Sequence, residues 1–149
     1  MYNRILISTD GSEVAQKGVD HGLSLAKALG LEATIVTVTE RFPVYSGGVG
    51  YDFSWSTPAL TEYAEGQKKE ADAILAAARQ SAERLGVSAE TVHVPEAQVA
   101  EAIISTAGEH NCDLIVMASH GRRGIRRMML GSQTAEVLAN SEIPVLVVR

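Results

Sequence analysis

Short apolar runs alternate along this chain with longer segments in which apolar residues recur every three or four positions. The short runs are rich in Ile, Leu and Val, a composition typical of strands that are buried on both faces of a sheet. The longer spacing is typical of amphipathic helices. We predict strands over residues 4–9, 33–39, 89–94, 114–117 and 143–148.

Local signals place four helices between these strands. Ser12 is positioned to cap a helix that Gly30 ends, and Pro58 begins a long second helix. A third helix follows Pro95, and the fourth covers residues 131–140. The apolar face predicted for the long helix includes Ala64, Ala71, Ile74, Leu75, Ala78, Ala82 and Leu85.

The strict alternation of strand and helix predicts an α/β fold, a doubly wound five-stranded parallel sheet with helices on both faces. Ligands of such sheets bind beyond the carboxyl ends of the strands, where the winding direction reverses. Two polar turns follow strands here, from Asp10 to Ser12 and from Ala118 to Gly121. If the first and fourth strands are neighbours, both turns face one crevice.

The segment after the fourth strand has the composition of an anion site. Its loop carries four arginines, Arg122, Arg123, Arg126 and Arg127. Gly121 lies at the start of this loop, and Gly131-Ser132 opens the helix that follows. Glycines permit a phosphate to approach closely, and a helix N-terminus offers unpaired N–H groups with partial positive charge. The sequence therefore predicts a phosphorylated ligand.

Composition restricts the class of protein. At 149 residues, with 46% hydrophobic and 21% charged residues, the chain fits one domain over residues 1–149. No apolar run approaches the roughly 18 residues that cross a bilayer, so we expect no membrane insertion. With no leader pattern and a single cysteine, Cys112, we expect a cytoplasmic protein in which this thiol is a buried hydrophobe. The net charge of −5 argues against nucleic-acid binding, whereas the local basic cluster favours a small anionic ligand.

The sequence lacks the patterns of several catalytic sites. It has no G-x-x-x-x-G-K-[ST], no G-x-G-x-x-G after the first strand and no G-x-S-x-G. The four histidines lack metal-ligand spacing, so we assign no metal site and no catalytic residue. Adjacent Ser119 and His120 are not expected to pair as nucleophile and base. Asp10 either contacts a ribose or base or caps its own turn.

One long segment does not fit a minimal domain. Five of the seven aromatic residues lie between Phe42 and Trp55, in a stretch without periodicity. Loops longer than about 12–15 residues without secondary structure are uncommon unless they are functional or mobile. Two interpretations stay open, a flap that covers the site or contacts a partner, and a surface loop held by its own aromatic residues.

From Ile5 to Val148 the chain resembles a single-domain universal stress protein. The nucleotide-binding branch of that family carries G-x2-G-x9-G-[ST] after the fourth strand, and Gly121, nine residues and Gly131-Ser132 match its last two elements. Ala118 occupies the position of the first glycine. Its methyl group is harmless where φ is negative and costly where φ is positive. The resemblance also implies the strand order 3-2-1-4-5.

The resemblance implies ATP as the ligand, with Mg²⁺ or Mn²⁺ as a companion ion. It implies that Asp10 and the backbone of Ser8 and Thr9 contact the base and ribose, and that Val38 lies against the adenine. The residues implied around the ribose and phosphates are Ala118, Ser119, His120, Gly121, Arg122 and Arg123. Those implied to hold the phosphates at the helix start are Gly131, Ser132, Gln133 and Thr134.

The family also forms homodimers, commonly through the last strand. The apolar run from Ile143 to Val148 suits edge pairing with a second copy, and a covered core strand is the alternative. We expect an ATP-binding homodimer, with higher oligomers open, that regulates a stress response through an unidentified protein partner. The alternatives are a nucleotide-free interaction module of the same fold and a slow ATP hydrolase. No carboxylate–metal pair or base is evident beside the phosphate loop, which argues against efficient phosphoryl transfer.

Overall fold

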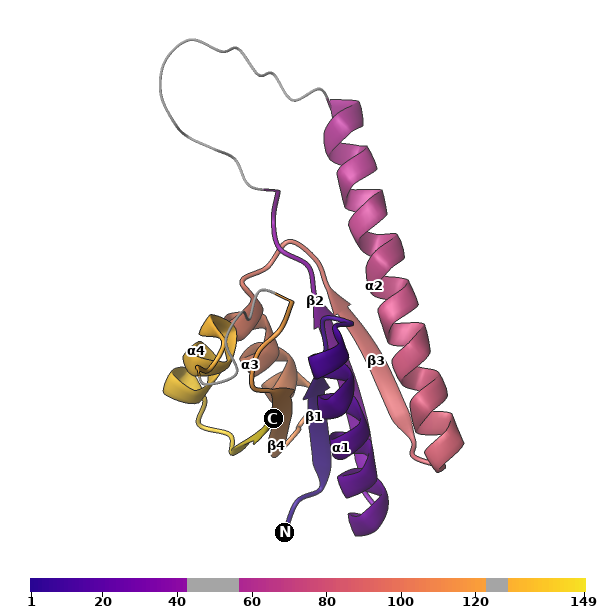
Figure 1. Ribbon diagram of the computed structural model, residues 1–149, viewed down its shortest axis with the longest axis vertical. Coiled ribbons are helices and arrows are strands. Elements are labelled where there is room, and N and C mark those ends of the chain that lie inside the picture. The colour runs from indigo at the N-terminus through magenta and orange to yellow at the C-terminus, as the bar shows by residue number, and fades with distance from the viewer. Residues whose placement is uncertain (43–56, 123–128) are drawn as a thin grey trace.

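Five parallel strands form one sheet in the described part of the chain, with helices on both faces (Figure 1). The computed structural model describes residues 1–42, 57–122 and 129–149. The elements in chain order are β1 (Arg4–Ser8), α1 (Glu13–Leu29), β2 (Glu32–Val38), α2 (Thr57–Leu85), β3 (Ala89–Val94), α3 (Val99–Glu109), β4 (Leu114–Ala118), α4 (Ser132–Asn140) and β5 (Val145–Val148). Most of the aromatic loop, residues 43–56, and the arginine cluster from Arg123 onward lie outside the described residues.

The sheet order β3-β2-β1-β4-β5 confirms the predicted topology. The chain winds outward from β1 to β3, and then returns to the other side of β1 to form β4 and β5. Ile5 pairs with Ala33 of β2 on one side and with Leu114 of β4 on the other. The winding direction therefore reverses between β1 and β4, and the turns after these two strands lie at the same edge.

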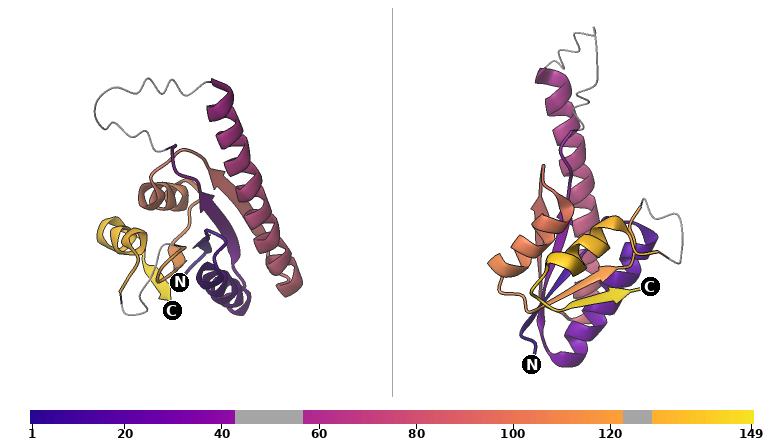
Figure 2. Two further views of the ribbon diagram at one scale, coloured as in Figure 1. Left: turned by 45° about the horizontal axis from the view of Figure 1, so that its top comes forward. Right: turned by 90° about the vertical axis from the view of Figure 1, so that its left-hand side faces the viewer.

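Two hydrophobic layers cover the two faces of the sheet. Ile5 and Ile7 pack with Val19 and Leu23 of α1 and with Ala78 of α2. The residues of opposite parity face the other helices; Leu6, Val36 and Ile115 pack with Ile103 of α3 and Val137 of α4. Figure 2 shows α3 and α4 together on one side of the sheet and α1 on the other. Burial on both faces explains why the strands read as continuous apolar runs.

The predicted helix signals act where the sequence places them. Ser12 Oγ accepts a hydrogen bond from Ala15 N at 3.1 Å and caps α1. Gly30 ends this helix with φ +67°, a left-handed conformation that glycine adopts without steric cost. β5 begins at Val145, two residues later than predicted, because Ile143 N instead donates to Ser141 Oγ at 3.1 Å.

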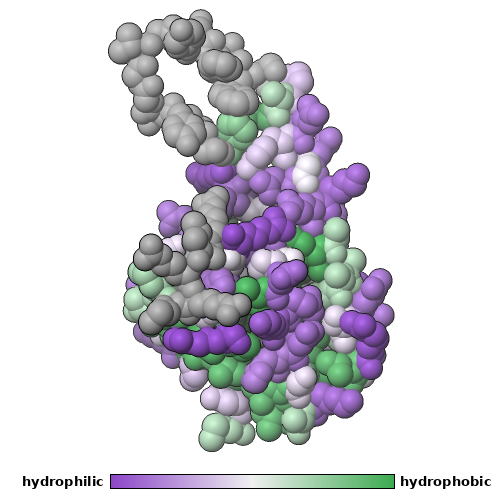
Figure 3. Space-filling model, viewed as in Figure 1, coloured by the Kyte–Doolittle hydropathy of each residue, from purple (hydrophilic) through white to green (hydrophobic). Residues whose placement is uncertain are grey.

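Helix α2 extends well past the carboxyl end of the sheet (Figure 1). Its buried residues begin only at Ala71 and continue through Leu75, Ala78 and Ala82. Ala64, which the apolar periodicity places on the buried face, is exposed because the sheet does not reach that turn. Hydrophilic side chains are frequent along this helix in Figure 3. The N-terminal half of α2 therefore stands beside the edge where a ligand is expected.

Two further expectations concern burial. Cys112 is buried against the α3 face of the sheet, as predicted, and burial raises the pKa of its thiol. Across the described ranges, no helix is both long and apolar enough to span a bilayer.

Candidate functional site

A cavity of about 840 Å³ opens at the carboxyl ends of β1, β2 and β4. All the predicted site residues except Ser119 and Arg123 line it. Ser119 is buried behind the cavity wall, and Arg123 is outside the described residues. The remaining set comprises Ser8, Thr9, Asp10, Val38, Ala118, His120, Gly121, Arg122, Gly131, Ser132, Gln133 and Thr134. Segments more than 100 residues apart in the sequence thus meet around one space.

Asp10 joins the turn after β1 to the loop after β4. Its Oδ1 accepts a hydrogen bond from Ser12 N at 3.0 Å, and its Oδ2 accepts one from Arg122 N at 2.9 Å. Burial alone would raise the pKa of this carboxyl, but the hydrogen bonds from Ser12 and Arg122 and the Arg122 charge outweigh it and lower the pKa below its ordinary value. Asp10 is therefore ionised at neutral pH and caps its own turn, one of the two roles that the sequence left open.

The N-terminus of α4 is tied to β4 and α3. Gly131 N donates to Ser119 O at 2.7 Å, and Thr134 Oγ1 donates to Ala118 O at 3.0 Å. Gln133 Oε1 accepts a hydrogen bond from Ala100 N at 3.2 Å. The first hydrogen bond within the helix runs from Ala135 N to Gly131 O at 3.0 Å, so the preceding N–H groups have no acceptor in the helix. These N–H groups belong to residues that line the cavity.

The chain packs closely against both motif glycines. A Cβ on Gly121 would overlap the Asp10 carboxylate. A Cβ on Gly131 would lie 3.0 Å from the Cα of His120, and Gly131 has φ −60°, a value open to any residue. We interpreted these glycines from the sequence as places where a ligand approaches the backbone. The structure shows that Gly121 also lets the turn after β1 approach the loop after β4, and that Gly131 lets the start of α4 pack against that loop.

Ala118, which replaces the first motif glycine, lies in extended backbone. It is the last residue of β4 and pairs with Val148 of β5. Among the described residues other than glycine, positive φ occurs only at Glu96 and Asn111. The methyl group of Ala118 therefore causes no backbone strain.

Ser119 and His120 differ from the sequence-based expectation. Ser119 Oγ lies 3.0 Å from His120 Nδ1, so the adjacent side chains do pair. However, Ser119 is only 6% exposed and does not line the cavity, whereas His120 does. The Ser119 hydroxyl therefore contacts the imidazole from a buried position outside the cavity lining, which does not suit a nucleophile.

One wall of the cavity escaped sequence analysis. Tyr63, Gln67, Glu70 and Ile74 of α2 line it, at spacings of three or four residues. Gln67 Nε2 donates to Tyr63 Oη at 2.6 Å, and the Tyr63 ring meets Phe42 edge-on with centroids 4.8 Å apart. The polar residues of this wall recur at helical spacing, and a search for apolar residues alone does not detect them.

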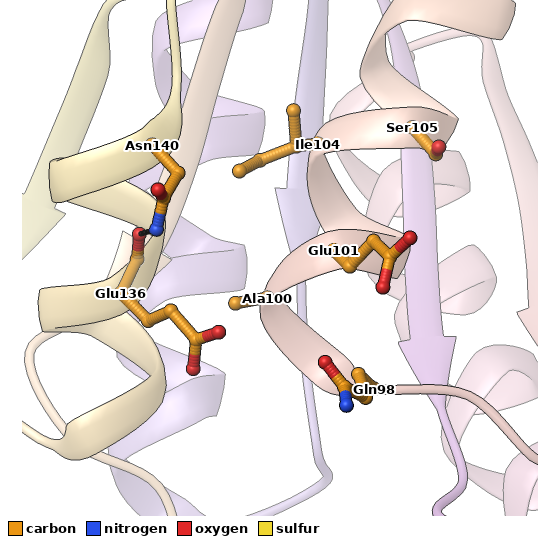
Figure 4. A pocket seen from close by; sticks show the side chains of 7 residues that line it. All are labelled: Gln98, Ala100, Glu101, Ile104, Ser105, Glu136 and Asn140. Atoms are coloured by element: carbon orange, nitrogen blue, oxygen red, sulfur yellow. Dashed lines mark hydrogen bonds between the residues drawn. The ribbon is translucent and has the colours of Figure 1, made fainter.

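A second, smaller cavity of about 350 Å³ lies between α3 and α4 (Figure 4). Glu101 and Glu136 are the charged side chains that line it, and Asn140 Nδ2 donates to the Glu136 backbone oxygen at 2.8 Å. Because both charges are negative, this cavity does not suit an anion. Within the described ranges, no group of three or more His, Cys, Asp or Glu side chains is arranged to hold a metal ion.

The fold and the larger cavity define a doubly wound α/β protein with a helix N-terminus and a basic side chain at the switch point of its sheet. Over residues 1–149 the chain matches the model of the universal stress protein family. The chain belongs to this family.

Named relatives and solved structures agree with this assignment. The chain is 34% identical to universal stress protein YxiE of Bacillus subtilis over 149 residues, 100% of both proteins. The solved structure of the Methanocaldococcus jannaschii protein MJ0577 has a TM-score of 0.79 and 27% identity, over 99% of this chain and 96% of that one. A universal stress protein solved in complex with cAMP has a TM-score of 0.69 and 27% identity, over 99% and 97% of the two chains.

Proposed function

We propose that this protein binds an adenine nucleotide, ATP, in the cavity between the β1 and β4 turns and acts as a homodimeric regulator of a stress response. The observation that carries the proposal is the N-terminus of α4, whose first-turn N–H groups belong to cavity-lining residues and have no acceptor within the helix. Such a terminus binds anions through these N–H groups and the helix dipole.

The phosphates belong at this end of the cavity. Ser132 supplies a hydroxyl in addition to its N–H, and His120 and Arg122 line the same space. The hydrogen bonds from Gly131 N to Ser119 O and from Thr134 Oγ1 to Ala118 O hold the helix start in place. A site that is already ordered loses less entropy when it binds.

The nucleoside would lie against the apolar part of the lining. Val36, Val38, Val99, Ile103 and Met117 line the cavity and provide an apolar surface for a base. Asp10 lines the cavity too, where its ionised carboxylate can accept a hydrogen bond from a ribose hydroxyl. Ser8 and Thr9 line the cavity beside it. The similar protein solved with cAMP supports an adenine nucleotide as the ligand class.

A companion Mg²⁺ or Mn²⁺ fits this site only as part of the nucleotide. Two carboxylates that line the cavity already have partners within the protein: Asp10 accepts backbone N–H groups, and Glu70 pairs with Arg122. An ion held mainly by phosphate oxygens and water, with few protein ligands, is the usual form of a Mg²⁺–nucleotide site. We assign the protein no catalytic residue.

The homodimer would form through β5. This strand lies at the edge of the sheet, and all four of its residues are only partly buried. An apolar edge strand with unpaired N–H and C=O groups is a template for pairing with another chain. Pairing with a second copy would cover it and place the two cavities in one molecule.

Mass spectrometry of ligand released from freshly purified, denatured protein tests the proposed function. We expect an adenine nucleotide, and a rise in melting temperature with added ATP. At a hundredfold excess over Kd a ligand stabilises the native state by about 2.7 kcal/mol. The absence of both signals would favour the nucleotide-free interaction module.

A further inference from the structure

An ion pair crosses the cavity between two of its walls. Arg122 Nη1, from the loop after β4, lies 2.5 Å from Glu70 Oε1 of α2, and both residues line the cavity. Both side chains are about half exposed, at 51% and 50%. An exposed pair of this kind adds little to folding stability. Its position in the cavity lining means that it can affect ligand binding instead.

The backbone of Arg122 is fixed, whereas its side chain has a choice of partners. The N–H of Arg122 is held by Asp10, which sets where the side chain begins. Its Nη2 lies 3.3 Å from the position that a Cβ on Gly11 would occupy, so the guanidinium lies over the β1 turn. A guanidinium has five N–H donors and binds carboxylates and phosphates in the same planar geometry. The Glu70 carboxylate thus engages a group that a phosphate would also engage.

The charges that line the cavity determine how strongly this competition affects the binding of a phosphate. Among the described residues, Asp10, Glu40 and Glu70 bring carboxylates to it, and Arg41 and Arg122 bring guanidinium groups. Arg41 Nε donates to the Glu96 backbone oxygen at 3.0 Å. Each additional phosphate group of a ligand adds negative charge, which Arg122 must neutralise.

We propose that Glu70 is a specificity-determining residue that lowers the affinity of the site for nucleotides with more phosphate groups, by competing with those phosphates for Arg122. This inference rests on the proposed function, because it presumes that an adenine nucleotide occupies the cavity. AMP meets the competition least and ATP most. The helix N-terminus and Arg122 would make the site bind ATP more tightly than AMP, and Glu70 reduces that difference in affinity.

Calorimetric titration of AMP, ADP and ATP into the full-length protein, Glu70→Gln and Glu65→Gln tests this inference. Glu65 is exposed on the same helix and does not line the cavity, so its substitution controls for the loss of one charge. We expect Glu70→Gln to tighten ATP binding by roughly two- to fivefold, the range corresponding to one exposed ion pair, with a smaller gain for ADP and the smallest for AMP. Glu65→Gln should leave all three affinities unchanged.

A double variant separates competition for Arg122 from general repulsion. In Arg122→Gln, the further change Glu70→Gln should give no additional tightening, because the shared partner is absent. Three results would overturn the inference while nucleotide binding stands. Glu70→Gln could still tighten ATP binding in the Arg122→Gln background, it could weaken ATP binding on its own, or it could have the same effect as Glu65→Gln. If neither wild type nor Glu70→Gln binds any of the three nucleotides, the proposed function fails and the inference fails with it. Nucleotide binding that is measurable in Glu70→Gln but not in the wild type would support the inference.

Discussion

The backbone N–H of Arg122 donates to Asp10 Oδ2 at 2.9 Å, and this bond joins two turns that are 112 residues apart in the chain. It closes the switch point of the sheet between β1 and β4. Gly121 precedes Arg122 and leaves the space that the carboxylate occupies. The shape of the candidate site therefore depends on a small set of contacts within the protein.

Gly121→Ala should damage the site through this contact. Its added Cβ would overlap the Asp10 carboxylate, so the carboxylate must move and its bond to Arg122 N is lost. We expect a loss of about 1–3 kcal/mol in stability and at least about tenfold weaker nucleotide binding. Urea unfolding and calorimetry measure the two effects.

Gly66→Ala is the matched control for this substitution. Gly66 lies in α2 with nothing within 4 Å of its would-be Cβ, so alanine there should raise stability by up to about 1 kcal/mol through helix propensity. If Gly121→Ala behaves like Gly66→Ala, the close approach to Asp10 has no energetic consequence.

Asp10 should contribute stability that disappears in acid. Its folded-state pKa lies below the ordinary value, so its contribution is present above the unfolded-state pKa and is lost as pH falls through the folded-state pKa. Asp10→Asn leaves one side-chain oxygen for the N–H groups of Ser12 and Arg122, so one of these donors faces an amide N–H. The substitution should cost about 1–2 kcal/mol at neutral pH. The wild type and the variant should converge in stability once the pH falls below the folded-state pKa of Asp10.

Urea unfolding across this pH range measures the difference, with Asp20→Asn as a control. Asp20 is exposed on α1, and its carboxylate accepts a hydrogen bond from the Gln16 side chain of the same helix. A gap between wild type and Asp10→Asn that stays constant with pH would show that the ionised carboxylate is not the stabilising species.

Val147→Pro should separate the proposed dimer from the fold. Pro144 O accepts a hydrogen bond from Ile115 N of β4, and Val148 O accepts one from Ser119 N just after β4. By the alternation of a strand, the N–H of Val147 therefore points to the free edge. Proline removes that donor without breaking a bond to β4, and proline is tolerated in edge strands. We expect monomers by light scattering at micromolar concentration, with near-native circular dichroism.

Val147→Ala retains the N–H and provides the comparison, because it should remain dimeric. A wild type that is monomeric under the same conditions would rule out pairing through β5. A dimer that survives Val147→Pro unchanged would place the interface elsewhere.

The hydrophobic pattern predicted all the strands and helices of the described chain to within a few residues, because a strand buried on both faces and an amphipathic helix leave different periods. The edge that carries the cavity followed from the polar turns at Asp10 and Ala118. The sequence did not show why Gly121 is a glycine, since its approach to Asp10 depends on tertiary packing between distant segments. The wall formed by Tyr63, Gln67 and Glu70 was missed because α2 passes the end of the sheet there, where apolar burial no longer marks the inward face.

Calorimetric titration of ATP into wild type and Ser132→Ala tests the central claim most directly. Ser132 lies at the start of α4 and lines the cavity, and alanine removes its hydroxyl without adding bulk. We expect saturable binding to wild type and roughly ten- to hundredfold weaker binding to Ser132→Ala, the loss expected for one hydrogen bond to a charged group, on protein shown to be folded by circular dichroism. The absence of measurable binding of any adenine nucleotide to wild type, or equal ATP affinity in both proteins, would contradict a phosphate site at the N-terminus of α4.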